Sequence, residues 1–270
     1  MNAPSPSVQI ERPQGDLIVI RLNRPKSLNA MSMDALGELH RALDEVLGDT
    51  GIRVIVLTGN GAAFCAGLDL KSVLDSDGRM RLGVTEAYEL QECFVGIVRR
   101  LRASDKTVIA AVHGVAVGAG FALAMAADIR FASTDASFHV GAVRIGITAG
   151  ECGISYHLPR LVGASRAFEL MLTGRPVDAD EAARIGLVAG VVAPEALMER
   201  AFACARQVLA SSPYATKHTK RVMWANLDAA SLDAAIELEN HAQVLGLMTP
   251  DFAEAAQAFV EKRSPRFTGL

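Results

Sequence analysis

The stretch HGVAVGAGFALAMAAD, residues 113–128, decides the fold. It contains three glycines, and nearly all its other side chains are small and apolar. Glycine has no Cβ, so a glycine backbone can approach another group closely. The residues just before, TVIAAV at 107–112, are rich in β-branched side chains, which is typical of a buried strand. We therefore predict a strand, a glycine turn and a buried helix across residues 107–128.

A transmembrane helix is the alternative for the same region. In residues 108–127 the only polar side chain is His113, and Gly114 and Gly118 form a GxxxG spacing. However, eight of these twenty residues are alanine and only one is leucine. A buried strand and helix give the same hydropathy, and this composition favours them.

The overall composition indicates one sizeable globular protein. The chain has 270 residues, of which 50% are hydrophobic and 21% are charged. A net charge of −3 creates no field that would gather nucleic acid or an anionic membrane, so we expect neither as a partner.

The cysteines and the N-terminus favour a cytoplasmic protein. Cysteines 65, 93, 152 and 204 form no CxxC pair and no metal-ligand spacing, so we expect reduced thiols and no metal site. The first residues, MNAPSPSVQIE, lack the basic and apolar regions of a signal peptide.

Strands and helices alternate in the first half of the chain. Residues 8–12 and 17–22 are predicted to form a hairpin, Ser32 to cap a helix with leucines at helical spacing, and 53–58 to form a buried strand. After 128–133 the pattern is helical only, at 166–172, 180–185, 195–209, 217–224, 232–245 and 250–262. This order predicts an α/β body followed by a helical region.

Two glycine-bearing loops follow predicted strands, FCAGLD at 64–69 and GVAVGAG at 114–120. Such turns can present unpaired backbone N–H groups, and a helix N-terminus adds partial positive charge. Two such donors at one point would stabilise an oxyanion, and a Cβ at 118 or 120 would keep a substrate carbonyl away. The pattern does not complete GxGxxG, so a dinucleotide site is not expected.

Several motifs together resemble the crotonase superfamily, the enoyl-CoA hydratase/isomerase family. The resemblance covers nearly the whole chain, in the family's order, at residues 23–30 (NRPKSLNA), 64–70 (FCAGLDL), 110–120 (AAVHGVAVGAG), 158–163 (LPRLVG), 172–174 (LTG), 182–188 (AARIGLV) and 259–263 (FVEKR). It implies an α/β fold, a crotonase-like spiral of ββα repeats over 1–195. It also implies a C-terminal helical region over 196–270 that builds a homotrimer or a dimer of trimers.

The resemblance also implies an acyl-CoA thioester as ligand, with coenzyme A as part of the substrate and no separate cofactor. The backbone amides of Leu68 and Ala119 would form the oxyanion hole. The implied contacts to substrate and CoA are Lys26, Ala66, Leu68, Asp69, Leu70, Lys71, Gly118, Ala119 and Lys262. Lys262 would come from a neighbouring subunit, and ordinary surface lysines are the alternative for Lys26 and Lys262.

The sequence departs from the family pattern at the two positions where hydratases carry glutamates. These positions are Ala122 and Ala142, and neither side chain can transfer a proton. General acid–base groups contribute about 10²–10⁴-fold each, so hydration by two glutamates is not expected.

Glu151 is the candidate replacement. It lies in GITAGECG at 146–153, and counting back from LPR places it where isomerases of the family often carry an acidic residue, after one extra loop residue. Burial beside an acyl chain would raise its pKa toward working pH. The alternative is a carboxylate near a helix N-terminus with only a dipole role.

Other polar residues are weaker candidates. His113 and His139 are expected to be packed core histidines, whereas Tyr156 and His157 are placed to line the pocket. We expect Asp69 to fix its turn by hydrogen bonding to backbone.

The sequence therefore predicts an acyl-CoA enzyme that shifts a C=C bond by proton transfer through Glu151. Two alternatives stay open. One is an enoyl-CoA hydratase with a non-standard acid or base, and the other is an inactive acyl-CoA-binding carrier or regulator.

Overall fold

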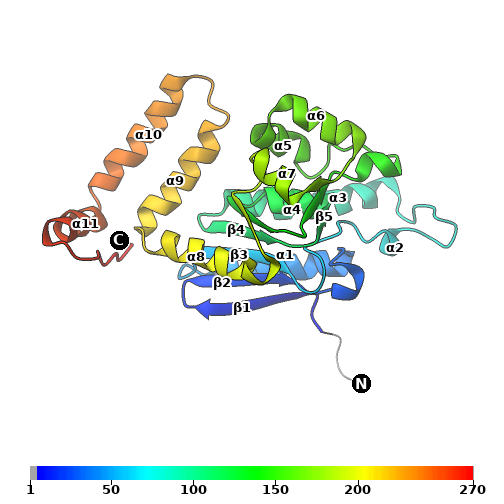
Figure 1. The fold of residues 1–270 in the computed structure, drawn as a ribbon, viewed down its shortest axis with the longest axis horizontal. Coiled ribbons are helices and arrows are strands. Elements are labelled where there is room, and N and C mark those ends of the chain that lie inside the picture. Colours follow the sequence, from blue (N-terminus) through cyan, green and yellow to red (C-terminus); the bar gives the residue numbers. More distant parts are fainter. Residues whose placement is uncertain (1–4, 270) are drawn as a thin grey trace.

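A six-stranded sheet forms the centre of the computed structural model, which describes residues 5–269 (Figure 1). Its strands lie in the order β1-β2-β3-β4-β6-β9, with β1 and β2 antiparallel and every later pair parallel. The bounds are β1 (Val8–Gln14), β2 (Leu17–Leu22), β3 (Val54–Gly59), β4 (Thr107–Val112), β6 (Ile129–Ser133) and β9 (Gly190–Val192). The hairpin predicted near the N-terminus and the strand predicted over 107–112 are both confirmed.

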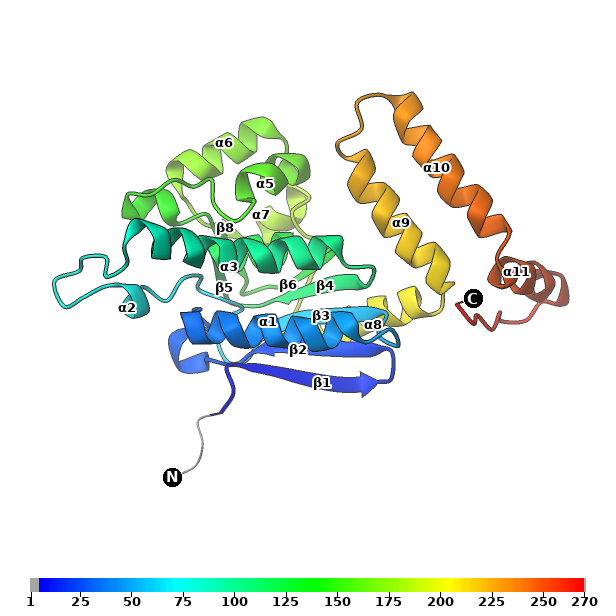
Figure 2. The same cartoon turned by 180° about the vertical axis from the view of Figure 1, so that it is seen from behind.

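Both faces of the inner strands β2, β3, β4 and β6 are buried, whereas the edge strand β1 is largely exposed. Helices α1 (Met33–Gly48) and α3 (Val84–Ala103) lie over one face, and α8 (Leu197–Leu209) lies over the other (Figures 1 and 2). Side chains alternate between the two faces, so that Ile18 and Ile20 pack on the α1 side while Leu17 and Val19 pack on the α8 side. Parallel sheets covered by helices on both faces have such wholly apolar strands.

A second, smaller layer runs beside the central sheet. It contains β5 (Val115–Val117), β7 (Ser137–His139) and β8 (Val177–Asp178), with β5 and β7 parallel. Strand β4 is followed by β5 and α4 (Ala119–Met125), and β6 by β7 and a 3₁₀ turn (Ala142–Ile145). After β3, Cys65 forms a bridge to β5, and α2 (Leu70–Val73) follows. This recurrence confirms the expected spiral of ββα repeats.

Most of the helices predicted from the sequence are present in the structure. The main differences are short strands that the sequence did not predict. Ser32 caps α1, and its Oγ accepts from Ala35 N at 3.4 Å. The remaining helices of the body are α5 (Ile154–Val162), α6 (Ala164–Thr173) and α7 (Ala179–Arg184). The expectation of helix alone after 133 is wrong, since β7, β8 and β9 lie there. Strands of two or three residues are too short to show an alternating pattern.

The last three helices, α9 (Pro213–Asn226), α10 (Leu232–Leu247) and α11 (Pro250–Glu261), project from the body (Figures 1 and 2). Lys220 fastens α9 to the body, because its Nζ pairs with Asp128 at 2.9 Å and donates to two backbone carbonyls. Helix α10 has no buried residue and exposes several large apolar side chains. Such surfaces often mark protein interfaces, but assembly into trimers stays a prediction.

Helix α8 belongs to the expected C-terminal region by sequence, yet it covers the sheet. The domain boundary predicted between residues 195 and 196 stays a prediction. Within residues 5–269, none of the helices combines the length and the apolar character that crossing a lipid bilayer requires. Residues 107–125 form strand β4, the short strand β5 and the wholly buried helix α4 instead.

The turn before α4 lies directly on the loop after β3. Phe64 N donates to His113 O at 2.8 Å, Cys65 N to Val115 O at 3.0 Å, and Val117 N to Cys65 O at 2.9 Å. A Cβ added to Gly114 would lie 2.0 Å from Ala62 O. A Cβ added to Gly120 would lie 2.2 Å from Cys65 O. Glycine is required at 114 and 120 because two backbone segments contact each other there. The sequence instead predicted the close approach of a substrate carbonyl at Gly120.

We predict that Gly120→Ala lowers the free energy of unfolding by about 1–3 kcal/mol, because the added methyl group forces the two backbones apart. Urea unfolding followed by circular dichroism measures the change. Gly37→Ala is the matched control, since its Cβ would meet only Arg41 Nη1, at 3.6 Å, in the middle of α1. There alanine should be neutral or stabilising. Equal stability of Gly120→Ala and the parent would contradict the close contact.

Candidate active site

Two backbone amides lie where the glycine loops meet. Leu68 N and Ala119 N donate to no group among residues 5–269. Ala119 is the first residue of α4, where an amide has no partner within the helix. A Cβ on Gly67 would lie 3.5 Å from Ala119 N, so the main chain just before Leu68 is close to the second amide. Their convergence on one ligand oxygen stays a prediction.

The backbone around Leu68 is held in place from both sides. Met31 N donates to Gly67 O at 2.8 Å, and Asp69 N donates to Met31 O at 3.0 Å. The sequence predicted that the Asp69 side chain fixes this turn through a backbone bond, and that is wrong. The Asp69 carboxylate instead pairs with Arg24 at 2.9 Å, and Arg24 also donates to Ala30 O. The two residues of this ion pair are 45 positions apart, so no local sequence pattern could predict it.

Glu151 lies against the same turn. Its Oε1 is 3.0 Å from the position that a Cβ would take on Gly118, the residue before Ala119. The carboxylate makes no hydrogen bond or ion pair with any residue in the described range 5–269. Because burial penalises an uncompensated charge, the pKa of Glu151 rises from its ordinary 4.5 to about 7.

The alternative role of Glu151, a carboxylate that only interacts with the dipole of the following helix, has less support. Its backbone O accepts from Ile154 N at 2.8 Å, so the residue does precede α5. The N-cap of α5 is Gly153, however, and no side chain caps that helix. A capping carboxylate would have a lowered pKa, which is opposite to the direction found.

Ala122 and Ala142 border the turn without contributing an ionisable group. Ala122 N donates to Gly118 O at 2.9 Å in the first turn of α4, and the side chain is fully buried. Ala142 is also buried and follows Gly141, whose Cβ position is 3.1 Å from Val117. The two positions that the resemblance predicts to match the hydratase glutamates are therefore apolar here.

An apolar hollow adjoins the second amide. It is small, about 10 Å³, which is room for roughly one water molecule. Its lining residues come from α3, α4 and the loops at Met31 and Cys152: Met31, Phe94, Ile97, Val98, Ala119, Leu123 and Cys152. Sequence patterns did not identify it, because no motif joins residues so far apart along the chain.

Of the residues predicted to contact CoA, those near the 3₁₀ turn and the Ala66–Lys71 segment lie close together, whereas Lys262 lies far from them. Lys26 is exposed in a 3₁₀ turn (Pro25–Ser27), and Lys71 is exposed on α2. Ala66 N donates to Leu28 O at 2.9 Å, which ties that 3₁₀ turn to the Ala66–Leu68 segment. Lys262 follows α11, at the opposite end of the molecule from α2 (Figures 1 and 2). Within one chain it does not join the others, so a role from a neighbouring subunit stays a prediction.

His113 and His139 are half-buried rather than packed in the core as predicted, and their rings contact other groups. His113 Nε2 contacts Gly61 O at 3.1 Å, and His139 Nε2 contacts Ser137 Oγ at 2.7 Å. His157, which was placed to line the pocket, instead contacts Arg102 Nη1 at 2.5 Å. Burial, followed by nearby arginines, lowers the pKa of His157 to about 4.

Arg102 lies over the Trp224 ring, 3.5 Å from its centroid, and so joins α3, α5 and α9. The neighbouring Tyr156 hydroxyl donates to Asp228. Sequence reasoning missed this stack because its members are brought together only by tertiary structure.

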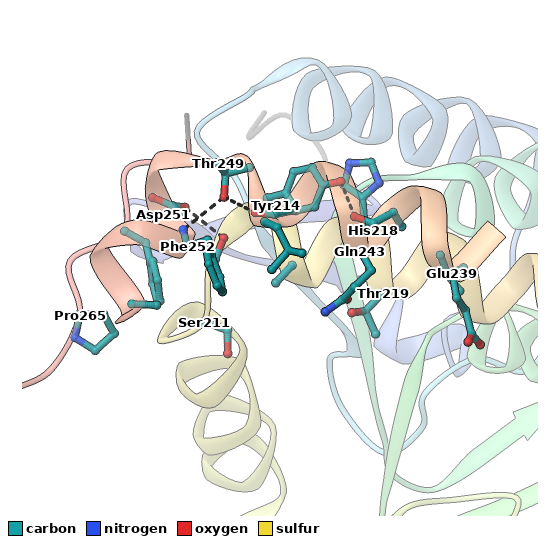
Figure 3. Close-up of a pocket in the computed structure, with 18 of the residues that line it drawn as sticks. Ser211, Tyr214, His218, Thr219, Glu239, Gln243, Thr249, Asp251, Phe252 and Pro265 are labelled. Atoms are coloured by element: carbon teal, nitrogen blue, oxygen red, sulfur yellow. Dashed lines mark hydrogen bonds between the residues drawn. The ribbon is translucent and has the colours of Figure 1, made fainter. Parts of the chain in front are cut away.

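A wider hollow lies elsewhere, between α9, α10 and α11 (Figure 3). Tyr214, His218, Thr249, Asp251 and Phe252 are among its lining residues. Tyr214 OH donates to Ala242 O at 2.8 Å across it. It shares no lining residue with the turn at Gly118, so we do not assign it to the candidate active site.

Comparison with known proteins identifies the family. A model described as Enoyl-CoA hydratase/isomerase matches residues 12–270. A Mycobacterium tuberculosis protein (strain ATCC 25618 / H37Rv) named "Probable enoyl-CoA hydratase EchA12" is 43% identical over 265 residues, 97% of this chain and 92% of the relative.

Solved structures of proteins from the same family have a similar fold. A probable enoyl-CoA hydratase/isomerase from Mycobacterium abscessus has a TM-score of 0.89 and 39% identity, covering 97% of this chain and 99% of that one. A monofunctional enoyl CoA isomerase from M. smegmatis has a TM-score of 0.73 and 38% identity, covering 86% and 99%.

We predict that the Glu151 carboxyl titrates near pH 7 in the folded protein. Carbon-13 NMR of glutamate-labelled protein measures this, and Glu151→Gln identifies the resonance. Because the folded pKa exceeds the ordinary 4.5, folding stability should fall as pH rises from about 4.5 to about 7. The same fall should be smaller in Glu151→Gln. A midpoint below pH 5 for this resonance would show that the carboxylate is solvated or paired.

Proposed function

The chain belongs to the enoyl-CoA hydratase/isomerase family, and we propose that it isomerises the C=C bond of an enoyl-CoA thioester. In this proposal Glu151 carries the proton, and the amides of Leu68 and Ala119 hold the thioester oxygen. The observation that supports it most is the unpaired Glu151 carboxylate beside Gly118. The proposal also takes Ala122 and Ala142, both buried, as the positions of the hydratase glutamates, as the family resemblance implies.

The reaction needs one proton relay and no water. With a 3-enoyl thioester, ionised Glu151 removes a proton from C2, and the electron pair shifts into the thioester to give a dienolate. The negative charge develops on the thioester oxygen, where two N–H donors would stabilise it. Glu151 then returns the proton to C4, which leaves the double bond between C2 and C3. One proton leaves C2 and one arrives at C4, so the atoms balance.

The pKa of Glu151 suits this role. A general base works best when its pKa lies near the operating pH, because it is then ionised often enough to accept a proton and acidic enough to return it. Burial gives this value of about 7 without any charged neighbour. The activity should therefore rise with pH through about 7, as Glu151 ionises.

Hydration is supported less well by these residues. In the family pattern two glutamates hold the attacking water, and the corresponding methyl groups here cannot do so. Named relatives include hydratases as well as an isomerase, so the family alone does not decide between the reactions. The two alanines also favour a second candidate function, an acyl-CoA carrier without chemistry.

We predict that purified protein in deuterated water converts a 3-enoyl-CoA into the 2-enoyl isomer without gaining the mass of water. Mass spectrometry gives the mass, and NMR gives the position of the double bond. Glu151→Gln should lower kcat/KM by about 10²–10⁴-fold. Glu195→Gln, an exposed glutamate on another part of the molecule, serves as the matched control and should leave the rate unchanged.

Three results would overturn the proposal. A 3-hydroxyacyl-CoA as main product would identify a hydratase. Binding without turnover across short, medium and aromatic enoyl-CoAs would identify the carrier. Full activity of Glu151→Gln would remove Glu151 from the mechanism.

A further inference from the structure

A short segment, residues 28–31, lies beside the loop that carries the Leu68 amide. Met31 forms a parallel bridge to Leu68 through hydrogen bonds with the residues before and after it. Successive N–H groups of an extended chain point to opposite sides, so Leu68 N points away from Met31. On that opposite side the same loop is bridged to β5, which leads into Ala119. The position of residues 28–31 therefore decides where the Leu68 amide points.

Asn29 fastens this segment to the loop after β3, and only 2% of its surface is exposed. Its Nδ2 donates to Asn60 O at 2.9 Å and to Ala63 O at 2.7 Å. Its Oδ1 accepts from Arg24 N at 2.8 Å, and its backbone O accepts from Cys65 Sγ at 3.2 Å. Both N–H bonds and the oxygen of the side-chain amide are thus satisfied. Together they hold the segment against the loop that carries the candidate oxyanion amide.

Arg24 holds the other end of the loop. Its Nη2 pairs with Asp69 at 2.9 Å, and its Nη1 donates to Ala30 O. Because Arg24 N also bonds the Asn29 side chain, the two residues form one network. This network contacts the loop both before and after Leu68.

The backbone at the centre of the network is left-handed. Leu28 has a φ of 50° and Asn29 a φ of 55°. Asparagine tolerates such a φ, whereas leucine adopts it at a cost in free energy. Strained residues persist only where their surroundings fix them, and they cluster at functional sites. The hydrogen bonds of Asn29 and Arg24 fix this turn.

We infer that Asn29 and Arg24 are positioning residues that direct the Leu68 amide at the thioester oxygen. They act through the backbone of Leu68 rather than by touching the substrate. A hydrogen bond weakens steeply as its angle departs from linear, so a small rotation of this amide removes much of its effect. The inference rests on the oxyanion hole of the proposed function, but not on isomerisation.

Carbon-13 NMR of bound butyryl-CoA, labelled at the thioester carbonyl, tests this without relying on turnover. Hydrogen bonds to the carbonyl oxygen should move its resonance to higher frequency than in the free ligand. Asn29→Gly still adopts a positive φ but lacks the side-chain bonds, and should lose a large part of this shift. In isomerisation assays its kcat should fall by about 10²-fold with KM near the parent's, because a displaced donor acts mainly on the transition state.

A second variant and two controls accompany Asn29→Gly. Arg24→Lys covers poor folding of that variant, and its single point charge cannot hold both partners of the guanidinium, so the shift should shrink. Arg12→Lys is the matched control, because Arg12 pairs with Asp49 at 3.0 Å at the end of the sheet opposite to the loop after β3. Val46→Ala removes buried methyl groups near the end of α1 and controls for lost stability. Both controls should keep the parent's shift.

The inference is overturned if the bound carbonyl shows no shift in the parent. It is also overturned if Asn29→Gly and Arg24→Lys both keep the parent's shift, even when both are less stable, since the two residues would then support only the fold. Normal isomerisation by both variants with an unchanged shift would overturn this inference and leave the proposed function standing. A shift that both variants lose, in a protein that does not isomerise, would overturn only the proposed function.

Discussion

Three main-chain hydrogen bonds between the loop after β3 and the turn after β4 hold the candidate site together. They fix the backbone of Cys65 against Val115 and Val117, and so bring the loop ending at Leu68 next to the start of α4. Gly114 and Gly120 make the contact possible, because a Cβ at either position would overlap a carbonyl oxygen. Since the contact uses backbone only, nearby side chains can vary without losing it.

This separation between backbone and side chains bears directly on the chemistry. The amides that would hold a thioester oxygen do not depend on the identities of residues 122 and 142, whereas hydration does. If Ala122 and Ala142 occupy the positions of the hydratase glutamates, as the resemblance implies, the proposed oxyanion hole is kept while the chemistry that it can support is changed. A single half-buried carboxylate beside Gly118 then suits a reaction that moves a proton within the ligand.

The sequence predicted the features that depend on local pattern. Residues 107–128 indicated a strand, a turn and a buried helix because small apolar side chains and glycines are adjacent in the chain. Glu151 was identified by counting from a motif, and the structure places it beside the turn. Features that depend on distant partners were not predictable, such as the ion pair of Asp69 with Arg24 and the stack of Arg102 on Trp224. The short strands β7, β8 and β9 were missed because they contain too few residues to form a pattern.

The most direct measurement of the central claim is the infrared stretch of a ¹³C-labelled thioester carbonyl in bound butyryl-CoA. Strong donation from Leu68 N and Ala119 N should lower its frequency below that of the free ligand in water. Leu68→Ala keeps its amide and should keep the shift. Ala119→Pro lacks one N–H, at a helix position that tolerates proline, and should lose much of it. A bound carbonyl that absorbs like the free ligand, or an unchanged shift in Ala119→Pro, would contradict an oxyanion hole built from these two amides.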